Sequence, residues 1–150
     1  MFLPDEDYKK VLSTVPIVCV DCLVLNEKGE FLLIRRNNQP LKGEYWVPGG
    51  RVYKNEKLFS AVYRKMLDEI GVEVKIVRLI GFFEEFFPDT KQKANGGVHS
   101  ISFLYEVNAI SDDIKLDDQS SDWGWYKDMP PRLKAHYDKM NPQLGIAIAY

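Results

Sequence analysis

The sequence has few of the residues that usually hold transition metals or disulfides, with two cysteines and two histidines in 150 residues. No apolar run approaches the roughly 18 residues of a membrane-spanning helix, and the N-terminus has no basic stretch followed by an apolar one. The net charge of −2 is far from the basic excess that a general nucleic-acid binder needs to replace phosphate counterions. We therefore expect a cytoplasmic protein without a signal peptide that binds neither membranes nor nucleic acid.

Cys19 and Cys22 form a C-x-x-C pair, a spacing that zinc and redox sites also use. Both fall inside the apolar run 16–25, which predicts a buried strand. Residues three apart on a strand point to opposite faces, so the two sulfur atoms should diverge. Because the sequence has no second cysteine pair, we interpret both as reduced, buried thiols that pack as small hydrophobic groups.

With 45% hydrophobic and 28% charged residues, the chain has the composition of one globular domain over residues 1–150. Mixed strands with a central and a terminal helix predict an α+β or α/β sandwich. The segment 72–87 is either two strands or one strand strongly bent at Gly81. Helices are expected at 5–12, 57–70 and 131–140, and strands at 16–25, 30–36, 46–48, 72–87, 99–108 and 123–126.

Glycines bound the central helix on both sides. Gly49 and Gly50 predict a tight turn before it, because glycine adopts backbone conformations that other residues avoid. Gly71 suits the left-handed conformation that ends a helix. Between them, one apolar stripe recurs at every fourth residue, formed by Leu58, Val62, Met66 and Ile70.

One face of this helix carries Lys65, Asp68 and Glu69. Acids on such a face, with a carbonyl from the preceding turn, form an oxygen site that suits Mg²⁺ against a diphosphate. Considered alone, Lys65 and Glu69 would be a surface salt bridge worth about 0.5 kcal/mol. Arg64 and Glu56 are expected to pair and brace the turn. The glycine turn ahead of the acids favours the metal and diphosphate interpretation.

The spacing of these residues resembles the Nudix box of hydrolases that cleave nucleoside diphosphates linked to another moiety. Gly50 is followed by five residues and Glu56, and then by seven residues and the segment 64–72. The resemblance implies a Nudix-like mixed β-sheet flanked by helices, and hydrolysis that depends on Mg²⁺, with Mn²⁺ as a substitute. At the position of Lys65 the family commonly has an acid that helps to activate water. An ammonium group cannot do so, and it repels the cation.

GDP-mannose mannosyl hydrolases also lack this first acid, and the sequence resembles that branch outside the box as well. The resemblance implies that water attacks the anomeric carbon of a GDP-mannose-like nucleotide sugar and releases GDP and free sugar. It also implies a homodimer. The matching segments are Met1-Phe2-Leu3, Glu6-Asp7, Ser13-Thr14, Gly29-Glu30-Phe31-Leu32-Leu33 and Val47-Pro48-Gly49-Gly50-Arg51-Val52.

The resemblance assigns roles to individual residues. Arg36 matches a guanidinium that binds and neutralises the leaving diphosphate. Asp21 matches an acid near the sugar. The carbonyl of Gly49 and the side chains of Glu69 and Gln119 match the metal ligands.

The general base is not fixed by the sequence. Ser120 falls where the branch has a histidine base, and Ser100 falls near a leaving-group tyrosine. We expect Ser120 to contact substrate, but a hydroxyl alone is a poor base near neutral pH. Glu85 matches a second histidine of the branch and is our hypothesis for the catalytic base. The other candidates are Glu84, His99, Asp117, Asp118 and Asp122.

Two other functions stay open. One is a Nudix pyrophosphatase that attacks phosphorus, which Asp68 favours and Lys65 disfavours. The other is a nucleotide-sugar binding module that has lost turnover. Tyr45 and Trp46, next to the glycine turn, are candidate pocket walls. The aromatic residues that could stack a base but more often belong to a core are Phe82, Phe83, Phe86, Phe87, Trp123 and Trp125.

Overall fold

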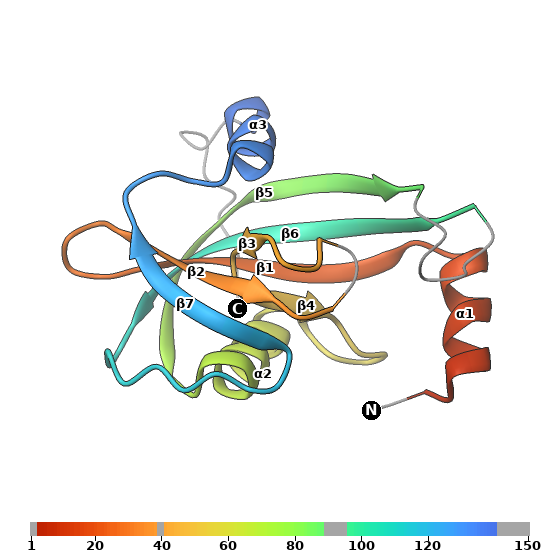
Figure 1. Ribbon diagram of the computed structural model, residues 1–150, viewed down its shortest axis with the longest axis horizontal. Helices are drawn as coiled ribbons and strands as arrows, with labels where there is room; N and C mark the ends of the chain where they lie inside the picture. The colour runs from red at the N-terminus through yellow and green to blue at the C-terminus, as the bar shows by residue number, and fades with distance from the viewer. Residues whose placement is uncertain (1–2, 39–40, 89–95, 141–150) are drawn as a thin grey trace.

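A computed structural model describes residues 3–38, 41–88 and 96–140 (Figure 1). None of the helices in these ranges is long and apolar enough to cross a membrane. Three helices and seven strands follow in the order α1 (Asp5–Thr14), β1 (Ile17–Leu25), β2 (Phe31–Arg36), β3 (Tyr45–Trp46), β4 (Gly49–Arg51), α2 (Leu58–Ile70), β5 (Val74–Phe87), β6 (Val98–Ala109), β7 (Ser120–Tyr126) and α3 (Pro131–Lys139).

The strands form one mixed sheet in the order β3-β2-β1-β6-β5, with β4 added to β1 and β7 added to β2. β1 is parallel to β6 and antiparallel to β2 and β4. β1 and β2 pair only beside their hairpin, at Leu25 and Phe31, and separate further along. The predicted mixed sheet flanked by helices is confirmed.

The sheet separates two apolar cores, with α2 on one face and α3 on the other (Figure 1). Val20, Cys22 and Val24 of β1 pack with Met66 of α2 in one core. Leu23 lies in the second core, which also contains Leu133 of α3 and Leu104 of β6. The alternation along β1 therefore follows the two-residue period of a strand that is covered on both sides.

Helix α2 confirms the predicted apolar stripe. Val62, Met66 and Ile70 are fully buried. The helix ends at Gly71, which has φ of 65° and donates its N–H to the Leu67 carbonyl at 3.1 Å. A glycine tolerates this left-handed conformation because it has no Cβ.

The brace between Glu56 and Arg64 is also confirmed. The Nε of Arg64 lies 2.6 Å from one Glu56 carboxylate oxygen, and its terminal nitrogen lies 2.8 Å from the other. The same guanidinium donates to the Arg51 carbonyl at 3.0 Å and so ties the helix to β4. The Arg64 hydrogen bonds lower the pKa of Glu56. This ion pair fixes the loop between β4 and α2.

Some predicted boundaries were wrong. Gly49 and Gly50 do not form a turn but belong to β4, whose residues pair with 19–21 of β1. For the segment 72–87, the single-strand alternative is the correct one, and the register of this strand with β6 shifts between Leu79 and Gly81 and once earlier. β7 begins at Ser120 instead of Trp123, because its first residues pair with β2. Residues 89–95, between β5 and β6, and residues 141–150 lie outside the described ranges.

Replacing Gly71 with alanine should lower the free energy of unfolding by about 1 kcal/mol, because the new Cβ disfavours a positive φ. The built Cβ would also lie 3.2 Å from the Lys115 Cβ. Urea denaturation of Gly71→Ala against the exposed-site control Glu73→Ala measures the effect. Equal midpoints for the two variants would contradict it.

Candidate active site

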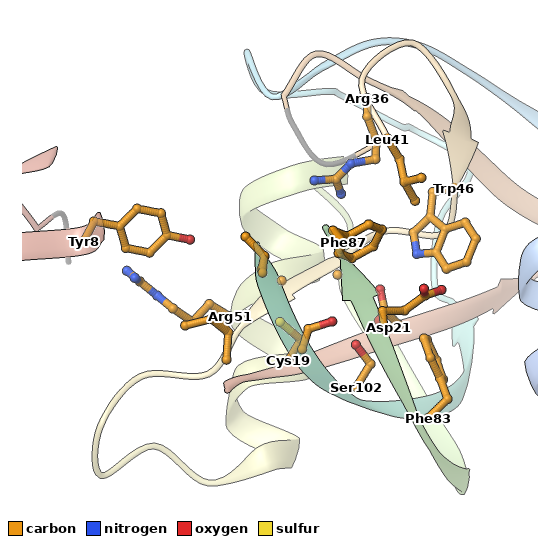
Figure 2. A pocket seen from close by; sticks show the side chains of 16 residues that line it. Tyr8, Cys19, Asp21, Arg36, Leu41, Trp46, Arg51, Phe83, Phe87 and Ser102 are labelled. Atoms are coloured by element: carbon orange, nitrogen blue, oxygen red, sulfur yellow. The ribbon is translucent and has the colours of Figure 1, made fainter. Parts of the chain in front are cut away.

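A pocket of about 200 Å³ opens where β1 and β2 separate. Its lining comes mainly from four strands, β1, β4, β5 and β6. Tyr8 of α1 and Arg36 at the end of β2 also line it. Figure 2 shows Tyr8 and Arg51 on one side and Arg36 and Trp46 on the other. The lining includes two acids, two arginines, a tyrosine and a glycine, namely Asp21, Glu85, Arg36, Arg51, Tyr8 and Gly49.

Asp21 is one of two buried acids that line this pocket, with 8% of its surface exposed against 6% for Glu85. Burial raises the pKa of its carboxyl to about 6, although hydrogen bonds from Ser102 and Trp46 and the charge of Arg36 oppose the rise. A carboxyl with such a pKa is mostly ionised at neutral pH and still accepts a proton readily. Of the predicted site residues, Asp21 has the surroundings best suited to a general base.

Gly49 lets β4 lie directly against this acid. A Cβ built on Gly49 would fall 2.3 Å from the Val20 carbonyl oxygen and 2.7 Å from the Asp21 Oδ1. Both distances are far below van der Waals contact, and the first obstacle is backbone that cannot move aside. The position therefore requires glycine for close approach of two chains.

Two guanidinium groups enter the pocket. Arg36 stands at the end of β2 and contributes to the charge felt by Asp21. Arg51 of β4 lies between two aromatic rings, 5.1 Å from the Tyr8 ring centre and 5.7 Å from that of Tyr53. Guanidinium groups bind phosphate through paired hydrogen bonds, so a pocket lined by both arginines suits a diphosphate.

Cys19 lines the same pocket and is only partly buried, whereas Cys22 is fully buried, and both are free thiols. Burial raises the pKa of the Cys19 thiol to about 12, with the negative charge of Asp21 adding to the rise. The thiol is therefore protonated at neutral pH and unsuited to nucleophilic attack. Reduced thiols without a metal or redox pairing were predicted, but Cys19 is more exposed than expected.

Glu85 also reaches the pocket, but its carboxylate has close partners. Arg132 donates to both of its oxygens, from Nε at 2.9 Å and from the terminal nitrogen at 2.5 Å. His136 Nε2 lies 2.8 Å from the first oxygen. Burial raises the pKa of Glu85, but the hydrogen bonds from Arg132 and His136 lower the pKa by more than burial raises it. The pKa of Glu85 is therefore below its usual value. The geometry therefore favours an anchor between β5 and α3 over a proton acceptor.

Two of the three predicted metal donors, Glu69 and Gln119, already have partners. One Glu69 oxygen accepts the Gly49 N–H at 2.9 Å, and the other lies 2.9 Å from the Lys65 ammonium. The side-chain oxygen of Gln119 accepts a hydrogen bond from Asn38. Within the described ranges, no three Asp, Glu, His or Cys side chains gather closely enough to hold a metal ion. With an ammonium group on one of its oxygens, Glu69 does not fit a divalent cation.

The remaining base candidates lie outside the pocket lining. His99 stacks on the exposed ring of Phe86, with the ring centres 4.4 Å apart. Its strand neighbours Val98 and Ser100 line the pocket, so His99 points to the other face of the sheet. Ser120 is buried and pairs with Arg36 across β7 and β2. Its predicted contact with substrate stays a prediction.

Trp46 lines the pocket as predicted, but three other lining residues were missed. Ser102 donates to Asp21 from β6, more than eighty residues away in sequence. Tyr8 comes from α1, and Arg51 was noted only as part of the matching segment. Strand pairing could have been used to find Ser102, because it is the register partner of Cys19.

Known proteins resemble this chain over most of its length. A family model described as NUDIX domain matches residues 15–143. The low-salt glycan biosynthesis protein Agl8 of Haloferax volcanii is 38% identical over 119 residues, which are 79% of this chain and 76% of that protein. The ADP-ribose pyrophosphatase of Methanocaldococcus jannaschii is 29% identical over 137 residues, 90% of this chain and 77% of that protein. The crystal structure of a MutT protein from Methanosarcina mazei Go1 shares the fold with a TM-score of 0.69 at 23% identity, covering 87% of this chain and 97% of that one.

The raised pKa of Asp21 predicts a pH-dependent stability. The folded state holds this proton more tightly than the unfolded state, so the stabilisation is full below the unfolded pKa of 3.8 and is lost as pH rises through about 6. The wild-type free energy of unfolding, relative to that of Asp21→Asn, should fall by on the order of 2 kcal/mol between about pH 4 and pH 7. Urea denaturation across this range measures it. A comparison of wild type with Asp128→Asn, which changes an exposed acid, should show no such trend.

Proposed function

Because this chain belongs to the Nudix family, as the match over residues 15–143 shows, we propose that it hydrolyses a nucleoside diphosphate sugar. The observation that carries the proposal is that a buried acid, Asp21, and the guanidinium of Arg36 line one pocket, and that the charge of Arg36 acts on Asp21. GDP-mannose is the substrate favoured by the sequence resemblance. Nudix hydrolases generally use divalent metals such as Mg²⁺.

In the proposed step, Asp21 takes a proton from water as the water oxygen bonds to the anomeric carbon of the sugar. The bond from that carbon to the diphosphate oxygen breaks, and its electron pair stays on the oxygen. The products are the free sugar and the nucleoside diphosphate. Arg36 is placed to balance the charge that the leaving diphosphate gains.

The size of the pocket supports the sugar as the enclosed part. A volume of about 200 Å³ is below the range of about 300–1,000 Å³ that encloses a typical small-molecule ligand. One end of a nucleotide sugar fits such a space, with the rest outside. Trp46 and Phe83 line the inner side of the pocket, where Asp21 lies.

The relatives support the proposal unequally. The glycan biosynthesis protein of Haloferax volcanii is named for a process that handles sugars. The ADP-ribose pyrophosphatase is named for cleavage of a diphosphate, which keeps attack on phosphorus as the second candidate. The partners of Glu69 and the ammonium at position 65 disfavour that candidate, because Glu69 is then not available to activate water.

Hydrolysis of a panel of GDP-sugars and ADP-ribose in ¹⁸O-labelled water separates the two. Label in the released sugar is expected. Label in a phosphate would reject attack on carbon and leave the pyrophosphatase. Saturable binding without any product would instead support a binding module.

The identity of the base is tested by two isosteric substitutions. Asp21→Asn should lower kcat by about 10²- to 10⁴-fold, the usual contribution of a general base. Glu85→Gln should change kcat much less and should lower thermal stability, because Arg132 loses a charged partner. The opposite ranking of the two kcat values would restore Glu85 as the base.

The wild-type rate should also rise with pH through about 6, as Asp21 ionises. The rise should follow a single ionisation. A rate that is flat across this range would argue against Asp21.

Two predictions from the resemblance are kept as proposals, a homodimer and a substrate contact at Ser120. Light scattering decides the first. The predicted divalent ion, Mg²⁺ or Mn²⁺ held through Gly49, Glu69 and Gln119, is disfavoured by the Lys65 ammonium 2.9 Å from Glu69, and titration with Mn²⁺ tests it.

A further inference from the structure

Lys65 is partly buried at the position where the Nudix family commonly has an acid. Its side chain is 16% exposed and that of Glu69 is 9% exposed, and the ammonium lies 2.9 Å from the carboxylate. The pair is therefore largely shielded from solvent and is not the surface salt bridge considered from the sequence. Breaking such a pair by removing one partner is costly, because the other charge is left unpaired.

The backbone of β4 makes room for this lysine. A Cβ built on Gly50 would lie 2.6 Å from the Lys65 Cε and 3.0 Å from its Nζ. Gly50 itself lines the pocket. The end of the Lys65 side chain therefore takes the space beside a pocket-lining glycine, on the side from which α2 approaches.

The charge of Lys65 also reaches groups around the pocket. It lowers the pKa of the Cys19 thiol and of the Asp117 carboxyl, against the effect of burial on each. Both carboxylate oxygens of Glu69 therefore have a partner, the Lys65 ammonium on one and the Gly49 N–H on the other. A divalent cation at Glu69 would have to displace the ammonium or lie beside it, and like charges at such distances repel strongly in a buried site.

We propose that the Lys65 ammonium is the resident cation of this site, so that it excludes a divalent ion from Glu69 and itself faces the diphosphate. The second part rests on the proposed function, since it needs a diphosphate ligand. The first part concerns metal binding alone. Arg36 and Arg51 line the pocket and Lys65 lies beside its lining residue Gly50, so the three side chains provide positive charges around the pocket.

Metal binding tests the first part without any substrate. The loss of the free Mn²⁺ signal in electron paramagnetic resonance measures Mn²⁺ binding to the wild type, to Lys65→Glu and to Lys75→Glu. The last variant makes the same charge change at an exposed strand position. Lys65→Glu should bind Mn²⁺ at least about tenfold more tightly than the other two. Circular dichroism checks that each variant is folded, and Lys65→Met replaces Lys65→Glu if the latter is not.

Nucleotide binding tests the second part. Calorimetric titration with GDP in EDTA and again in Mg²⁺ should give wild-type dissociation constants within about threefold of each other. Lys65→Gln should bind GDP about tenfold more weakly in EDTA, because it loses a charged donor to phosphate. Lys75→Gln should match the wild type.

The outcomes are distinct. Wild-type protein that binds Mn²⁺ as tightly as Lys65→Glu, or that needs Mg²⁺ for GDP binding, would overturn the proposal. So would an unchanged GDP affinity in Lys65→Gln. Failure of GDP to bind any variant would count against the proposed function, while the Mn²⁺ result would still decide whether Lys65 excludes the metal.

Discussion

The contact between Gly49 and Asp21 fixes most of the site. β1 has two partners on one edge, β2 near the hairpin and β4 beyond it. The change of partner opens the pocket, and it requires β4 to lie against a buried carboxylate without a side chain between them. The same glycine donates its N–H to Glu69 and so joins the acid of the sheet to the acid of the helix. A single backbone position thus aligns both.

Sequence periodicity was sufficient for much of the fold. The apolar stripe of α2, its end at Gly71 and the brace between Glu56 and Arg64 were predicted because each depends on residues within about two helical turns. The placement of Gly49 and Gly50 in a strand could not be predicted from periodicity. Glycine is typical of turns, and only a close neighbour from a distant segment explains it in β4.

Residues whose role depends on their own chemistry could be predicted from the sequence. Residues whose role depends on contacts with distant side chains could be predicted less well. Asp21 and Arg36 were identified from the resemblance, and the structure brings both into one pocket. The surroundings of Glu85 could not be foreseen, because Arg132 lies 47 residues away on a helix that folds back over β5. Burial of Lys65 likewise depends on how closely β4 packs on α2, which no local pattern reports.

The buried carboxylate of Asp21 has a consequence for anyone who would engineer this protein. Keeping the Asp21 carboxylate ionised in a buried position lowers the free energy of unfolding at neutral pH. Such a cost is typical of residues that are kept for activity instead of stability. Libraries screened for heat resistance alone would therefore enrich substitutions that delete this acid. A directed-evolution scheme for this scaffold needs a selection for product formation in every round.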